Sequence, residues 1–295
     1  MKKLLNTLYI TRQEAYLHKD RETIVIKQGD EKLGQFPSLS LGAILCFGRV
    51  SVSPFLMGYC AEQGIGLAFY TEHGRFLARI QGRENGNVLL RREQYRWADS
   101  PEKSNAVARL SVAAKIANSR SILQRELRNH GNNMPISEAV DKLGNNLRRV
   151  QYAKSVDEVR GMEGDAANTY FGVFNELIKG SGFVFGGRVR RPPTDPLNAL
   201  LSFVYSLVTQ ECVSALEGVG LDPYVGFLHK DRPGRPSLAL DMLEEFRAAW
   251  ADRFVLTLVN RKQIQNKDFV TDATGAVKMK EEPRKRTLTA YQERK

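Results

Sequence analysis

A histidine and two carboxylates lie close together in the stretch 224–247. His229 ends an apolar run, a turn rich in proline and glycine follows, and Asp241 and Glu244 lie on the helix predicted after that turn. Because the two acids are three residues apart, they lie on adjacent turns of one helix face. Carboxylate oxygens suit Mg²⁺ or Mn²⁺, and an imidazole favours Mn²⁺ slightly. The stretch therefore predicts a site for a hard divalent metal ion.

An ordinary amphipathic surface helix explains the same two acids. Projected at about 100° per residue, the apolar side chains of residues 238–250 cluster on one arc and the acids fall on the opposite side. A histidine near such a helix can equally be structural or solvated. Residue types and spacing alone leave both interpretations open.

Composition indicates an ordinary globular chain with an anionic partner. The 295 residues are 42% hydrophobic and 26% charged, and the net charge is +11. Lys and Arg neutralise phosphates, so nucleic acid is the first candidate partner, although some basic enzymes bind none. We expect a cytoplasmic protein without a membrane partner, because no stretch reaches the roughly 18 apolar residues of a membrane span and the start lacks the pattern of a signal peptide.

Cysteine usage points to a reducing compartment. The three cysteines, Cys46, Cys60 and Cys212, lie in apolar surroundings and form no C-x-x-C pair. We expect them to be buried free thiols, and their spacing excludes a zinc finger.

The hydrophobic period predicts an α+β protein of two domains. Residues 1–97 alternate with a period of two and contain two expected hairpins, with turns at 19–22 and 71–74. From about residue 98 the period changes to about 3.6, which predicts an α-helical domain over 98–295. The chain becomes basic from about residue 260, and its end is expected to be a loosely ordered tail, either a DNA-contacting arm or a solubilising end.

Two predicted helices of the second domain carry further candidates. Glu163 is flanked by Gly161 and Gly164. Two glycines in a helix interior are unfavourable, so something is expected to approach this backbone closely, either a packed helix or a ligand. In the apolar helix after residue 196, Asn198 and Tyr205 are polar interruptions that are either satisfied core groups or face a site.

Four ordered motifs resemble a known family. They are G-M-E-G-D-A-A-N-x-Y-F from Gly161, R-x-R-R-P-P-x-D-P-L-N-A-L-L-S-F-x-Y from Arg188, G-F-L-H from Gly226 and G-R-x-S-L-A-L-D-M-L-E-E-F-R from Gly234. Together they resemble the CRISPR-associated integrase and endonuclease family, the universal first Cas protein ("Cas one"). The resemblance covers essentially the whole chain and is nearest to the subtype I-C branch.

The resemblance implies a homodimer with a metal centre in its helical domain. It assigns Glu163, His229 and Glu244 as ligands of Mg²⁺ or Mn²⁺, with Asp241 as a supporting acid. It implies attack of the 3′-hydroxyl of a foreign DNA fragment on the CRISPR repeat, together with a small second Cas protein that bridges two dimers. The positions assigned to DNA contact, each of which is equally explained as a solvated or structural group, are Arg188, Arg190, Arg191, Lys230, Arg235 and Asn198.

Two other functions remain compatible with these residues. A structure-selective nuclease for branched repair intermediates would share the same site. A basic DNA-binding scaffold without catalysis would need none of the proposed ligands, and its affinity would simply fall with salt.

Overall fold

The chain forms two compact units in the computed structural model, which describes residues 6–82, 87–180, 182–189 and 192–294. One unit comprises Met1–Glu84 together with Met279–Lys295, and the other comprises Asn85–Lys278. The first unit is therefore shorter than the expected 1–97 and takes back the C-terminal segment. The α+β class is confirmed, with strands in the first unit and helices dominating the second.

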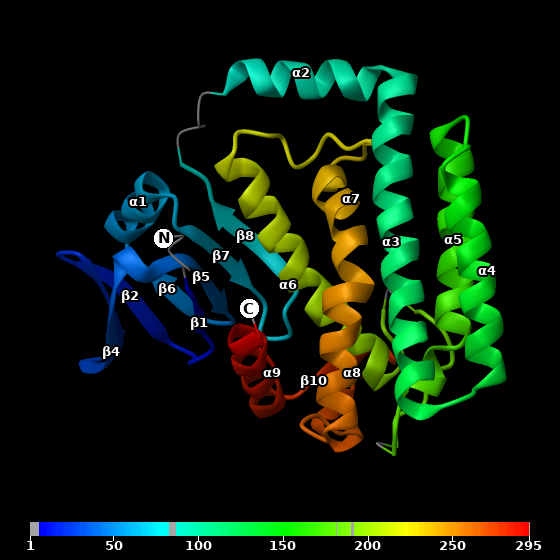
Figure 1. Ribbon diagram of the computed structural model, residues 1–295. Coiled ribbons are helices and arrows are strands. Elements are labelled where there is room, and N and C mark those ends of the chain that lie inside the picture. The colour runs from blue at the N-terminus through cyan, green and yellow to red at the C-terminus, as the bar shows by residue number, and fades with distance from the viewer. Residues whose placement is uncertain (1–5, 83–86, 181, 190–191, 295) are drawn as a thin grey trace. The chain divides into compact units, whose positions relative to one another are not determined.

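Two four-stranded sheets build the first unit. One has the order β1-β5-β7-β8 and the other β4-β3-β2-β6. The first three strands of the former pair in parallel, as shown in Figure 1. The strands are β1 (Asn6–Ile10), β2 (Ala15–Asp20), β3 (Thr23–Gln28), β4 (Glu31–Pro37), β5 (Leu41–Phe47), β6 (Val50–Val52), β7 (Gly66–Tyr70) and β8 (Phe76–Ile80).

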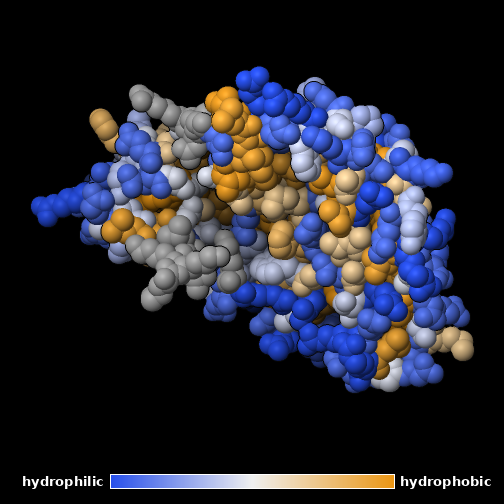
Figure 2. Space-filling view, turned by 45° about the horizontal axis from the view of Figure 1, so that its top comes forward, coloured by the Kyte–Doolittle hydropathy of each residue, from blue (hydrophilic) through white to orange (hydrophobic). Residues whose placement is uncertain are grey.

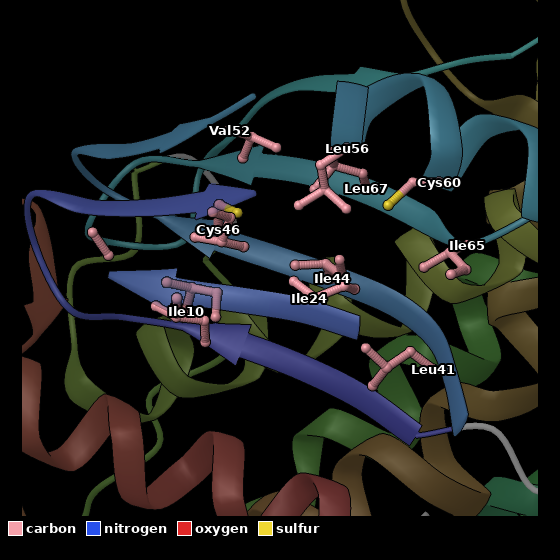
Figure 3. Packing of buried hydrophobic residues seen from close by; sticks show 13 residues of the cluster. Ile10, Ile24, Leu41, Ile44, Cys46, Val52, Leu56, Cys60, Ile65 and Leu67 are labelled. Carbon is pink, nitrogen blue, oxygen red and sulfur yellow. The ribbon is translucent and has the colours of Figure 1, made fainter. Parts of the chain in front are cut away.

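The core of this unit draws on both sheets and on helix α1 (Pro54–Gln63). Figure 3 shows side chains of the two sheets pointing toward one another. Helix α1 begins as its sequence predicts, since the Ser53 side chain accepts a bond from the Leu56 amide and Pro54 occupies the first turn. The three cysteines are buried free thiols, as expected.

Both expected hairpins are present. β2 pairs antiparallel with β3, and β7 pairs antiparallel with β8. Strand β4 was not expected, because its sequence E-K-L-G-Q-F-P is polar and mostly exposed. It forms as an edge strand against β3, a position in which a proline and charged residues are tolerated.

The expected loose tail is instead an ordered helix, α9 (Glu281–Arg294), that packs on β1. Leu288 and Tyr291 are buried in it. The low hydrophobicity of this segment hid the helix, because most of its apolar surface lies in a few residues on one side.

Helices form the second unit: α2 (Val88–Asp99), α3 (Pro101–His130), α4 (Met134–Val150), α5 (Val156–Gly172), α6 (Pro196–Gly218), α7 (Ser237–Phe246) and α8 (Arg253–Asn260). The short 3-10 turn η2 (Phe174–Leu177) follows α5, and the π-helical segment η3 (Arg247–Asp252) joins α7 to α8. In Figure 1, α3 runs between α5 and α7, and it contacts both. Helix α2 lies where the sequence was expected to remain strand-rich.

Helix α6 is the apolar centre of this unit. The Asp195 side chain caps it by accepting from the Asn198 amide, with Pro196 in the first turn. Among the described residues it is the one helix long and apolar enough to cross a membrane, but 56% of that apolar window is buried inside the protein. A buried core helix meets the same test, so α6 does not indicate a membrane protein. The face shown in Figure 2 is largely hydrophilic, with hydrophobic residues gathered in part of it.

Candidate metal centre

His229 is held by the carboxylate of Asp241. The Nδ1 atom of His229 lies 2.6 Å from Asp241 Oδ1, and the same carboxylate accepts the backbone N–H groups of Phe227, Leu228 and His229 at 2.6, 2.9 and 3.0 Å. With Nδ1 donating to Asp241, Nε2 is the nitrogen left for a ligand. Asp241 thus orients the imidazole and shapes the loop that carries it.

The two acids of α7 are not on a solvated face. Asp241 and Glu244 are each only 2% exposed, whereas Phe246 of the predicted apolar arc is 42% exposed. The surface-helix interpretation is therefore wrong for these two residues, and it holds for Glu245, which is exposed. Carboxylates are almost never fully buried without charged or hydrogen-bonding partners, so burial itself marks this pair.

Glu163 of α5 and Glu244 of α7 meet at the ammonium group of Lys115, which projects from α3. The Nζ atom of Lys115 contacts Glu163 Oε1 and lies 2.6 Å from Glu244 Oε2. His229 Nε2 lies 3.9 Å from Glu244 Oε1. The sequence-predicted residues Glu163, His229, Glu244 and Asp241 are thus brought together from two helices and one loop.

Arg247 supplies a second cation to this cluster. Its guanidinium lies 3.1 Å from Glu244 Oε1. Burial alone would raise the pKa of Glu244, but the positive charges of Arg247 and Lys115 outweigh it and lower that pKa from 4.5 to about 2. Glu244 therefore stays ionised and available as an oxygen ligand over the whole neutral range.

The donor set suits a hard divalent ion, but the described side chains do not already form an open cage for one. Within these residues no group of three or more His, Cys, Asp or Glu side chains is placed to hold a metal. Glu163 and Glu244 present oxygens to Lys115, and His229 presents Nε2 toward Glu244. Two carboxylates and one imidazole match the preferences of Mn²⁺ and Mg²⁺, provided the lysine ammonium gives way.

Two residues that the sequence did not reveal hold the His229 loop in place. Gln94 of α2 donates to the carbonyls of Asp222 and Val225, both at 2.8 Å. Arg160, one helical turn before Glu163 on α5, donates from Nε to the Leu228 carbonyl at 2.6 Å. The spacing of Arg160 and Glu163 on one helix was the only available signal, whereas Gln94 had none.

Two of the positions assigned to DNA contact have structural roles instead. Asn198 is fully buried; its oxygen accepts from Arg188 and from the Val189 amide, and its amide donates to the Gly187 carbonyl and to Asp195. Asn198 is thus a satisfied core group. The Arg188 guanidinium also donates to Ser202, so its bonds fold the loop onto α6.

The other assigned positions are less constrained. Lys230 is exposed and lies 3.6 Å from Asp157, and Arg235 is half-buried in the turn before α7. Arg190 and Arg191 lie outside the described residues. DNA contact by these four residues stays a prediction.

The glycines beside Glu163 face open space. A Cβ atom built on Gly161 or Gly164 would meet no atom of the described residues within 4 Å. A packed helix is therefore not the reason for these glycines, and the surface beside Glu163 is left smooth for a ligand.

Comparison with known proteins covers this site and the whole fold. The family model described as "CRISPR associated protein Cas1" matches residues 8–293. The chain belongs to the Cas1 family of CRISPR-associated endonucleases and integrases. The CRISPR-associated endonuclease Cas1 1 of Chlorobaculum tepidum is 52% identical over 300 residues, which cover 100% of this chain and 88% of that protein.

Solved structures agree with the Cas1 assignment. A CAS1 protein from Thermotoga maritima has a TM-score of 0.85 at 26% identity and covers 98% of this chain and 90% of its own. A Cas6-RT-Cas1–Cas2 complex has a TM-score of 0.83 at 22% identity, covering 100% of this chain and 32% of that one, and shows a shared fold. The Cas1 family match contains all four sequence motifs, including the buried acids of α7.

Proposed function

We propose that Glu163, His229 and Glu244 hold a divalent metal ion and that this centre carries the DNA chemistry expected of a Cas1 family member. The observation that supports it is the convergence of the three donors from α5, α7 and the loop between α6 and α7, with His229 oriented by the buried Asp241. An imidazole fixed by a carboxylate is the usual arrangement behind a metal-binding histidine. The three donors come from segments far apart in the sequence, as expected of a built site.

Each residue has a separate role in this proposal. Glu163 and Glu244 supply anionic oxygens, and His229 supplies Nε2. Asp241 keeps the Nδ1 proton in place and is a positioning residue, since its oxygens already accept backbone and ring N–H groups. A bound Mg²⁺ or Mn²⁺ would polarise the phosphodiester and lower the pKa of the attacking hydroxyl.

The proposed substrate is a DNA fragment whose 3′-hydroxyl attacks a phosphodiester of the CRISPR repeat. The net charge of +11 supports an anionic partner. The shared fold with a chain of a complex that contains Cas2 supports the small Cas protein as a partner. We further propose a homodimer of the subtype I-C branch that works in the cytoplasm, where CRISPR DNA lies.

The test compares His229→Ala with His130→Ala on a branched, fluorescent DNA substrate with Mn²⁺ or with EDTA. His130 is a matched control, because it lies on the exposed end of α3. We expect metal-dependent cleavage or joining to fall at least a hundredfold in His229→Ala, and to be retained in His130→Ala. Circular dichroism establishes that both variants are folded.

The products separate this proposal from its alternatives. Joined strands that require the small Cas partner support integration, whereas hydrolysis alone indicates a structure-selective nuclease. Equal activity of wild type and His229→Ala, or DNA binding without turnover, contradicts the metal centre and favours a scaffold.

A further inference from the structure

Lys115 is an unusual residue to find at the centre of this site. Its side chain is only 6% exposed, and its two ionic partners are Glu163 and Glu244, the two proposed oxygen ligands. A lysine is almost never buried unless it is paired. Nothing in the sequence marks it, since it lies in the middle of the long helix α3.

The charges of the cluster are already balanced. Lys115 and Arg247 contribute two positive charges, and Glu163 and Glu244 contribute two negative ones. A divalent ion entering the same cluster would meet two fixed cations at short range, where the interior screens charge poorly. The ammonium and the metal ion need the same carboxylate oxygens, so both cannot hold them in the arrangement the structure shows.

We propose that Lys115 is a resident counter-ion that competes with the divalent ion for Glu163 and Glu244. This inference rests on the proposed metal centre and adds a control over its loading. Lys115 keeps the buried carboxylates paired in the metal-free protein, and its ammonium leaves them when a metal ion enters.

The displaced ammonium needs a new anion, because an unpaired buried charge is costly. A DNA phosphate entering the same site supplies one. Metal and DNA therefore bind cooperatively, and each raises the affinity for the other by the same factor. A free protein with weak metal affinity and a DNA complex with strong affinity follow from this exchange.

The experiment is calorimetric titration of the full chain with MnCl₂, comparing wild type, Lys115→Met and Lys142→Met. Methionine keeps an unbranched stem and removes the charge. Lys142 is the matched control, since it is exposed and pairs with Asp165 on the same helix as Glu163. We expect Lys115→Met to bind Mn²⁺ at least tenfold more tightly than wild type, and Lys142→Met to bind it with unchanged affinity.

Thermal unfolding gives a second readout that does not involve activity. In EDTA, Lys115→Met is expected to unfold at a lower temperature than wild type, because two buried carboxylates lose their partner. Mn²⁺ should then raise its unfolding temperature more than that of wild type. Where the methionine variant does not fold in EDTA, Lys115→Gln, which keeps a hydrogen-bond donor without the charge, gives the same comparison.

The outcomes distinguish the two proposals. If wild type and Lys115→Met both bind Mn²⁺ with equal affinity, or the variant binds more weakly, Lys115 is not a competitor and the metal centre stands. If neither protein binds Mn²⁺, and Lys142→Met does not either, the metal centre itself is wrong.

Discussion

At the scale of single residues, the site rests on a second buried acid, Asp252 of η3. Burial raises its pKa from 3.8 to about 6, although the hydroxyl of Tyr205, 2.5 Å away, and the charge of Arg247 both act to lower it. Tyr170 and Arg188 also face this carboxyl and lower its pKa. Asp252 and Glu244 thus have opposite shifts, because Glu244 lies directly against two cations.

Replacing Asp252 by Asn should change the pH dependence of stability. Since the folded pKa lies above the ordinary value, the folded protein binds this proton more tightly, and the stabilisation is lost as pH rises from about 4 through 6. A shift of about two units corresponds to about 3 kcal/mol. We expect the free energy of unfolding of Asp252→Asn, relative to wild type, to rise by that amount between pH 4 and pH 7.5, measured by urea unfolding in EDTA.

The control for this measurement is Asp141→Asn, at an exposed position on α4. Its effect on the free energy of unfolding should stay within about 0.5 kcal/mol at every pH. A pH-independent difference for Asp252→Asn would show that the carboxyl has no raised pKa in the folded protein.

The sequence predicted the ligands and missed the cations around them. Glu163, His229 and Glu244 were identified because they lie in motifs, and acids and histidine have recognisable metal chemistry. Lys115 and Arg247 were missed, because a lysine or arginine on a helix is normally solvated, and only packing shows which one turns inward. Asn198 was misassigned for the same reason, since its partners lie in a loop that the sequence does not place.

At the scale of elements, the loop that carries His229 depends on a close approach at Gly226. A Cβ atom at this position would lie 2.8 Å from Asp241 Oδ2 and 2.8 Å from the Ser237 backbone. Helix α7 begins at Ser237 without a side-chain cap, and the Ser237 hydroxyl instead donates to the Lys230 carbonyl. Glycine is therefore required for the loop to reach α7.

Gly226→Ala should distort this loop, whereas Gly161→Ala should not distort α5. We expect the first substitution to lower the free energy of unfolding by about 1–3 kcal/mol and to weaken Mn²⁺ binding at least tenfold, because His229 loses its orientation. The second should raise stability by up to about 1 kcal/mol, since its Cβ enters open space in a helix interior. Calorimetry and urea unfolding measure both, and an unchanged Mn²⁺ affinity in Gly226→Ala would contradict the role of the loop.

Elements with strong periodicity were predicted well, and those set by tertiary context were not. The long helix α3 and the capped helices α5 and α6 follow from their apolar period and from Ser or Asp at their starts. Helix α2 was missed at a change of pattern, although its Gln94 holds the loop before His229. Such a residue acts through contacts more than a hundred positions away, which no local pattern contains.

At the scale of the whole molecule, the C-terminal segment belongs to the first unit rather than to the helical one. Helix α9 packs on β1, and Gln292 lies within hydrogen-bonding distance of Asn6, at 3.5 Å. The chain therefore starts and ends in the same unit, with the metal centre in the segment between. The stability of the N-terminal sheet should then depend on residues near the end of the chain.

Tyr291→Ala tests this dependence. Its side chain is fully buried, at 0% exposed, and removing a large aromatic ring from a core costs about 3–5 kcal/mol. We expect hydrogen exchange to accelerate in β1 and β5, while the amides of α3 and α7 keep their protection, because the two units have separate cores. Thr289→Ala, at an exposed position of the same helix, should change neither. Equal loss of protection in α3 and α7 would mean that the two units unfold as one, and no change in β1 would mean that α9 does not support the sheet.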